Sequence, residues 1–365
     1  MLVRIFLFLS SCLALSAANA QSGFVTAFLG DSIATGAVAH ASLKLDDRAL
    51  TEVFEGRVLV APDAATLEQR IARGYTFAGS DAPRRLAPSL REFAGPGSWA
   101  FHNALMQFSR RFLDMEEHAW SYLVGRELGS AASDVLIAAE DGARSLAGAA
   151  QARRVLEATQ GALPRHVFAL FTGNDLCGAD LGQATAAADY GAGLTQTLRT
   201  LARHGVAGSQ GTDIWLVNPI SVLQLVRSPA ILAKQVSAHG SVTTCGALYG
   251  LPSSAMERLA SAFPFVPQTP TDYCPTLFRD ARLNVTAQTV LANRIAEYRR
   301  QITNVVSSSP LAIPNGIRVH QIAATDEWLL GPDDIANDCF HLSYEGQMRL
   351  GQIILGSMNA RVAIK

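Results

Sequence analysis

Four residues in three short motifs have side chains suited to nucleophilic catalysis. Ser32 ends a Gly-Asp-Ser tripeptide after an apolar stretch, a position that exposes its hydroxyl and its backbone N–H at a strand-to-helix turn. Asn174, in a Gly-Asn-Asp tripeptide, would direct amide N–H donors at a developing oxyanion. Asp338 precedes His341 by three residues, so its carboxylate can hold the imidazole tautomer and stabilise the imidazolium.

Each motif also has a simpler structural interpretation. Asp31 and Ser32 form a common helix N-cap sequence, Asn174 lies in a turn-forming Asn-Asp pair, and Asp-x-x-His is frequent on protein surfaces. The catalytic interpretation therefore depends on whether the fold brings the three motifs to one place.

The elements that would position these motifs can be read from the apolar pattern. Short apolar runs with β-branched or aromatic residues predict buried parallel strands at 24–29, 134–139, 166–172, 213–218 and 317–323. Helical patterns lie at about 108–128, 143–159, 182–203, 221–235, 281–306 and 344–361. This alternation predicts an α/β sandwich with helices on both faces of a parallel sheet.

Two stretches interrupt the alternation. Residues 44–103 are rich in Pro, Gly and Arg, and residues 236–280 contain two cysteines and a Pro-rich apolar run at 263–270. Insertions at strand ends of such a sheet either build substrate pockets or decorate the surface. No linker-like boundary separates them from the rest, so residues 21–365 are expected to form a single domain.

Taken together, the three motifs resemble those of the SGNH (GDSL) hydrolase family in order, spacing and strand-end placement. This resemblance implies a flavodoxin-like three-layer α/β/α sandwich with a five-stranded parallel sheet. It implies that Ser32 is the nucleophile, His341 the general base and Asp338 the group that orients it. The implied oxyanion hole consists of the backbone N–H groups of Ser32 and Gly142 and the side chain of Asn174. The family usually has an Asn shortly before the glycine, and this sequence has none there.

A narrower resemblance is to the phospholipase B branch of that family. Its motifs appear here as Gly-Ala-Arg at Gly142 leading to Gln151-Ala-Arg-Arg-Val, as Gly-Asn-Asp-Leu-Cys177, and as Asp-Cys339-Phe-His-Leu-Ser. The likeness implies an exported serine esterase that hydrolyses carboxylic esters of lipids, such as phospholipids or lysophospholipids. A glycan O-acetylesterase and a lipid acyltransferase use the same catalytic set and stay open, and so does a non-catalytic envelope-binding protein.

The N-terminus predicts export. Arg4 is followed by an apolar stretch at 5–17 and by Ala-Asn-Ala ending at Ala20, which are the three parts of a cleaved signal peptide spanning residues 1–20. The alternative is a lipoprotein lipidated at Cys12. The protein is thus expected to be secreted or periplasmic.

The four remaining cysteines suit an oxidising compartment. Cys177, Cys245, Cys274 and Cys339 allow three connectivities and lack the close spacing of a zinc site. We expect Cys245–Cys274, which would close one Pro-rich loop. The family resemblance places Cys177 and Cys339 in loops over the same crevice, which implies that these two form the second bond.

Composition limits the partners. The 365 residues carry 30 Lys and Arg against 31 Asp and Glu, a net charge of −1, which favours neither nucleic acid nor an anionic membrane as a partner. No later segment is long and apolar enough to span a bilayer, so the expected partner is a small-molecule or lipid ester, and transient contact with a membrane surface stays possible.

Backbone donors and an imidazole suffice for ester hydrolysis, so we expect no cofactor and no metal. The group Asp114, Glu117 and His118 is interpreted as a charged helix face.

Overall fold

The computed structural model describes residues 24–36, 119–130, 135–140, 142–238, 241–249, 274–308, 316–336 and 338–362. The expected signal peptide, Cys12, the insertion at 44–103 and the helix face with His118 lie outside these residues, as does most of the second insertion.

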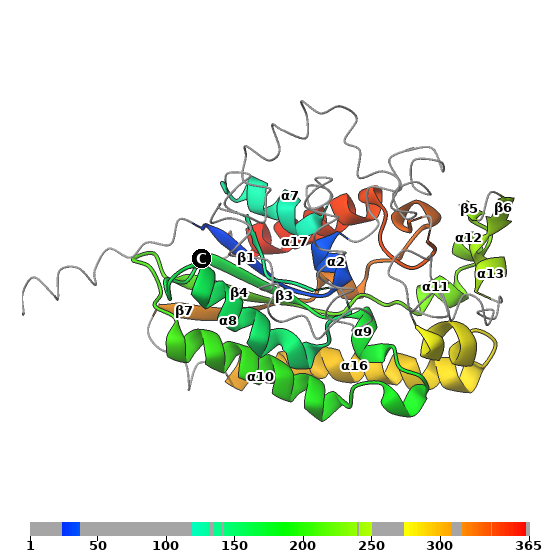
Figure 1. The fold of residues 1–365 in the computed structure, drawn as a ribbon, viewed down its shortest axis with the longest axis horizontal. Coiled ribbons are helices and arrows are strands. Elements are labelled where there is room, and N and C mark those ends of the chain that lie inside the picture. Colours follow the sequence, from blue (N-terminus) through cyan, green and yellow to red (C-terminus); the bar gives the residue numbers. More distant parts are fainter. Residues whose placement is uncertain are drawn as a thin grey trace, which may run out of the picture.

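A five-stranded sheet with all strands parallel forms the centre of the molecule (Figure 1). Its order is β2-β1-β3-β4-β7, with strands β1 Thr26–Gly30, β2 Val135–Ile137, β3 His166–Leu170, β4 Thr212–Val217 and β7 Ile317–Ile322. The expected strands were right to within two residues at each end. The carboxyl ends of β1 and β3 lie side by side, with Gly30 level with Leu170. In doubly wound sheets of this order, the crevice between these two strands is the usual ligand site.

Helices cover both faces of the sheet, so the α/β/α layering is confirmed. Helices α8 (Gly148–Ala158), α10 (Ala187–His204) and α16 (Val285–Ser308) lie on one side, and α7 (Trp120–Glu127) and α17 (Tyr344–Val362) lie on the other (Figure 1). Short helices follow strands or connect loops: α2 Ser32–Thr35, α9 Gly173–Leu176, α11 Gln224–Arg227, α12 Pro229–Leu232 and α13 Cys245–Leu248. The remaining short elements are a hairpin, β5 Gln235–Ala238 and β6 Ser241–Thr244, a π-helical turn at Thr276–Ala281, and 3₁₀ turns at Ser145–Ala147, Leu181–Gln183, Ala324–Asp326 and Pro332–Asp334.

One expected helix was wrong. Residues 221–235 form two short helices instead of one, and the second begins at Pro229 with Ser228 as its N-cap. Proline lacks the N–H that a continuous helix would need there, and it disfavours helical backbone in the residue before it. The Ser-Pro pair was a local signal for this break.

Aromatic side chains fill the core between the sheet and α7. Phe28 stacks on Phe168 at 4.9 Å between ring centroids, and Trp120 packs edge-on against Phe28 at 5.3 Å. Trp215 continues the row on β4 at 6.4 Å from Phe168. These rings pack β1, β3 and β4 together within the core. The loops that follow these strands therefore begin from a rigid sheet.

A buried glutamine side chain holds the last residue of β1. The amide of Gln151, on α8, accepts a hydrogen bond from the N–H of Gly30 and donates one to its carbonyl, both at 2.8 Å. Gly30 has φ +150°, and a Cβ there would lie 2.2 Å from the carbonyl oxygen of Leu170, so only glycine fits. This fixes the backbone two residues before Ser32.

Replacing Gln151 with Leu should destabilise the protein, because the N–H of Gly30 would stay buried without a partner, while its carbonyl would keep only the N–H of Glu140, at 3.1 Å. We expect a loss of about 1–3 kcal/mol in the free energy of unfolding, measured by urea denaturation. Arg153→Ala, an exposed change on the same helix, should cost less than about 0.5 kcal/mol. Equal stabilities of the two variants would contradict this role of Gln151.

All four expected cysteines form disulfides, but the expected pairing was wrong. The bonds are Cys177–Cys274 and Cys245–Cys339. The second insertion does not close on itself: its first cysteine bonds the loop before α17, and its last cysteine bonds the loop after α9. The pairing depends on which loops the fold places beside the two ends of the insertion, and spacing along the chain carries no such information.

Disulfide mapping tests this pairing directly. Proteolysis of the unreduced protein, followed by mass spectrometry, should yield peptides linked through Cys177–Cys274 and Cys245–Cys339. A linked peptide containing Cys245 and Cys274 would show that the insertion closes on itself.

The helices of the described residues include none that combines the length and the apolar composition required to cross a membrane.

Candidate active site

The turn after β1 presents Ser32 at the first position of α2. Asp31 is the N-cap of this helix, and its Oδ1 accepts the N–H of Ile33 at 3.0 Å. Ser32 is 6% exposed and lies at the carboxyl end of the sheet. A serine at the start of a helix, where backbone N–H groups are unpaired, can share its own N–H with a bound ligand.

The loop before α17 directs a histidine at this serine. Nε2 of His341 lies 3.0 Å from Oγ of Ser32, and Nδ1 lies 2.6 Å from Oδ2 of Asp338. Oδ1 of Asp338 accepts the backbone N–H groups of Phe340 and His341, both at 3.0 Å. The three side chains thus form a continuous hydrogen-bonded chain between residues 309 positions apart in sequence.

Electrostatics keep the acid of this chain ionised. Burial alone would raise the pKa of Asp338, but the attraction of His341 and the hydrogen bonds from His341 and Phe340 outweigh it and lower this pKa. An ionised Asp338 accepts the Nδ1 proton of His341, which leaves Nε2 free to accept the proton of the Ser32 hydroxyl.

The two other residues that the resemblance nominates lie at the same edge of the sheet. Asn174 is in α9, which follows β3, and Gly142 follows β2, on the other side of β1. Gly142 has φ +73°, a conformation that favours glycine. Among the described residues, the N–H groups of Ser32 and Gly142 and the side-chain amide of Asn174 have no hydrogen-bond acceptor.

A buried carboxylate joins the loops that carry Gly142 and Asn174. Oδ2 of Asp175 accepts the backbone N–H of Ser145 at 2.9 Å, and Oδ1 accepts its hydroxyl at 2.8 Å. Burial raises the pKa of Asp175, against the opposing effect of these hydrogen bonds. The sequence pattern indicates only a turn at this aspartate. Its place directly after Asn174 was the available signal for a positioning role.

Asp31 makes the corresponding connection between β1 and β3. Its Oδ2 accepts the N–H of Thr172 at 3.0 Å, while its Oδ1 caps the helix of Ser32. The hydroxyl of Thr172 in turn accepts the N–H of Ile220, beyond β4, at 2.8 Å. Nothing in the sequence marked Thr172 as a link between three strand ends.

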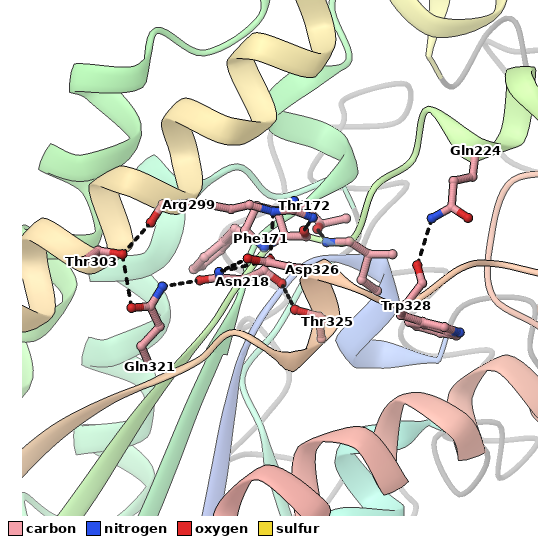
Figure 2. A network of polar contacts seen from close by, with 12 residues as sticks. Phe171, Thr172, Asn218, Gln224, Arg299, Thr303, Gln321, Thr325, Asp326 and Trp328 are labelled. Atoms are coloured by element: carbon pink, nitrogen blue, oxygen red, sulfur yellow. Dashed lines mark hydrogen bonds and ion pairs between the residues drawn. The ribbon is translucent and has the colours of Figure 1, made fainter.

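Beyond β4 the network continues to the loop that carries the histidine (Figure 2). The amide of Asn218 donates to both carboxylate oxygens of Asp326 at 3.0 Å, and Arg299 pairs with the same carboxylate at 2.8 Å. Thr325 donates its hydroxyl to the carbonyl of Asn218 at 2.9 Å. The chain that leads from β7 to Asp338 is therefore bonded to the end of β4.

The described part of the chain contains no group of three or more His, Cys, Asp or Glu side chains placed to hold a metal ion.

No family model matches the chain, and no curated protein matches it at a significant level.

The buried Asp31 predicts a specific pH dependence of stability. Burial raises its pKa from 3.8 to about 6, although the hydrogen bonds from Ile33 and Thr172 act in the opposite direction. The folded state therefore holds this proton more tightly than the unfolded state. Its contribution to stability is fully present below the unfolded pKa and is lost as the pH rises through the folded pKa.

Asp31→Asn removes this titration. Relative to the variant, the wild-type protein should lose on the order of 3 kcal/mol in the free energy of unfolding between about pH 4 and pH 7. Urea denaturation at several pH values measures the difference. Lost hydrogen bonds add an offset that does not change with pH, so a constant difference across this range would contradict the raised pKa.

Proposed function

We propose that this protein is a serine esterase that hydrolyses carboxylic esters through an acyl-enzyme intermediate. The observation that carries the proposal is the hydrogen-bonded chain from Ser32 Oγ through His341 to Asp338, at 3.0 and 2.6 Å. Nucleophile, base and orienting carboxylate in this order are the functional parts of a catalytic triad.

In the first step, Oγ of Ser32 attacks the ester carbonyl carbon while Nε2 of His341 takes the hydroxyl proton. The carbonyl oxygen becomes an oxyanion, which the N–H groups of Ser32 and Gly142 and the amide of Asn174 stabilise. The C–O bond to the alcohol then breaks, and the alcohol leaves with the proton from His341.

In the second step, water attacks the acyl carbon and gives one proton to Nε2 of His341. The second tetrahedral intermediate collapses, the bond to Ser32 breaks, and the proton returns to Oγ. The carboxylic acid is released and the triad regains its starting protonation state. Asp338 stays ionised throughout and stabilises the imidazolium in both steps.

The compartment agrees with this chemistry. The two disulfide bonds indicate an extracellular or periplasmic protein. Lipid esters are the proposed substrates, in line with the motifs shared with the phospholipase B branch, and the N-terminal signal pattern would bring the enzyme to such substrates by export. The apolar run at 263–270, which also favours an acyl chain, lies outside the described residues.

Hydrolysis of p-nitrophenyl esters from acetyl to palmitoyl tests the proposal. Ser32→Ala should abolish turnover, and Asn174→Ala should lower kcat by about 10²–10³ because one oxyanion donor is lost. Turnover that rises with acyl length would support lipid substrates, and turnover confined to acetyl would indicate a short-chain esterase instead.

Two matched variants serve as controls. Ser307→Ala and Asn304→Ala change exposed residues of α16 and should keep wild-type rates. Full activity of Ser32→Ala would refute the serine mechanism. If neither wild type nor variant turns over an ester or reacts with a fluorophosphonate, the protein is not a serine esterase.

A further inference from the structure

One neighbouring segment contacts the loop that carries Asp338 and His341 at several points. We call residues 326–343 the base loop and residues 224–249 the anchor segment. The anchor segment lies at the end of the molecule where the strands have their carboxyl ends (Figure 1). Its contacts with the base loop occur at successive points along that loop.

The first contact is made by Gln224, at the start of α11. Its side-chain amide donates to the carbonyl of Trp328 at 2.9 Å (Figure 2). The same amide accepts the N–H of Leu330 at 2.7 Å. The second contact is made by Lys234, whose Nζ donates to the carbonyls of Pro332, at 2.8 Å, and Ile335. Both side chains satisfy backbone groups of a loop that lies outside the five-stranded sheet.

The third contact reaches the peptide between acid and base. The hydroxyl of Tyr249 donates to the carbonyl of Cys339 at 2.6 Å, and Cys245 forms its disulfide with the same residue. Cys339 has φ +61°, a left-handed conformation that is unfavourable for a residue other than glycine. Surrounding contacts must therefore hold it in place.

Ring contacts make a parallel connection to the histidine. Tyr249 packs on Phe278 at 4.4 Å between centroids, Phe278 meets Phe340 edge-on at 5.7 Å, and Phe340 lies 4.8 Å from the ring of His341. Tyr249, 2% exposed, thus reaches the base loop through its hydroxyl and its ring face.

We propose that Tyr249 is a positioning residue: its hydroxyl holds the Cys339 carbonyl so that Asp338 and His341 keep the geometry needed to accept the Ser32 proton. Asp338 and His341 flank Cys339 closely, so rotation of that one residue changes the angle between carboxylate and imidazole. Catalysis depends on such angles, and small displacements cost much of the rate. The inference rests on the proposed esterase function.

Loss of the Tyr249 hydroxyl should lower the rate of turnover and leave substrate binding nearly unchanged. In Tyr249→Phe the ring contacts stay and only the hydroxyl is lost, so the fold should persist. We expect kcat to fall about tenfold with KM within about twofold of wild type. In proton NMR, the downfield resonance of the His341 Nδ1 proton should shift or broaden, because its hydrogen bond to Asp338 is no longer held.

Thr159→Val is the matched control. It removes another buried hydroxyl that donates to a backbone carbonyl, that of Val155, at 2.9 Å, beyond the amino end of β3. It should lower stability without changing kcat or the Nδ1 resonance. A second variant, Cys245→Ala with Cys339→Ala, removes the disulfide. If it folds, it should lower kcat and change the Nδ1 resonance more strongly than Tyr249→Phe does. If it does not fold, Tyr249→Phe alone tests the positioning role.

The outcomes separate the two proposals. Wild-type kcat and an unchanged Nδ1 resonance in Tyr249→Phe would overturn the positioning role, and so would a loss confined to KM or one equalled by Thr159→Val. Activity that survives Ser32→Ala would refute the esterase proposal instead. In that case, the Nδ1 resonance alone still decides whether Tyr249 holds the dyad.

Discussion

A single buried carboxylate, that of Asp31, determines how the serine sits relative to the strand beside it. One oxygen caps the helix that begins at Ser32, and the other accepts the N–H of Thr172 at the end of β3. Both segments are bonded to one planar group, so the turn of the nucleophile and the start of the Asn174 loop cannot shift independently. Burial of this carboxylate raises its pKa, because the ionised form loses its contact with water. This loss of solvation is the energetic cost of connecting the two segments.

Other polar side chains make similar connections around the site. Asp175 joins the loops after β2 and β3, Gln151 holds the end of β1, and Asp326 joins the loop after β7 to Asn218 at the end of β4. In each case a side chain satisfies backbone or amide groups of a neighbouring loop. Loops at strand ends have few sheet hydrogen bonds of their own, so these polar side chains supply the order that a preorganised site requires.

The second insertion acts as a brace for two of these loops. One disulfide attaches its beginning to the loop of Asp338 and His341, and the other attaches its end to the loop of Asn174. Each bond closes more than 90 residues of chain, so each restricts the unfolded state strongly. The insertion therefore links the loop of the proposed acid and base to the loop of a proposed oxyanion donor.

The five parallel strands could be predicted from the amino-acid sequence alone, because short apolar runs are a local signal of buried strands. The sequence also nominated Ser32, Asn174, Asp338 and His341, because all of them follow strands whose carboxyl ends meet at one edge. It did not reveal Thr172 as a link between strand ends, nor the disulfide partners. Those depend on contacts between residues about 50 to 140 positions apart, and the way the whole chain folds sets which loops come within bonding distance.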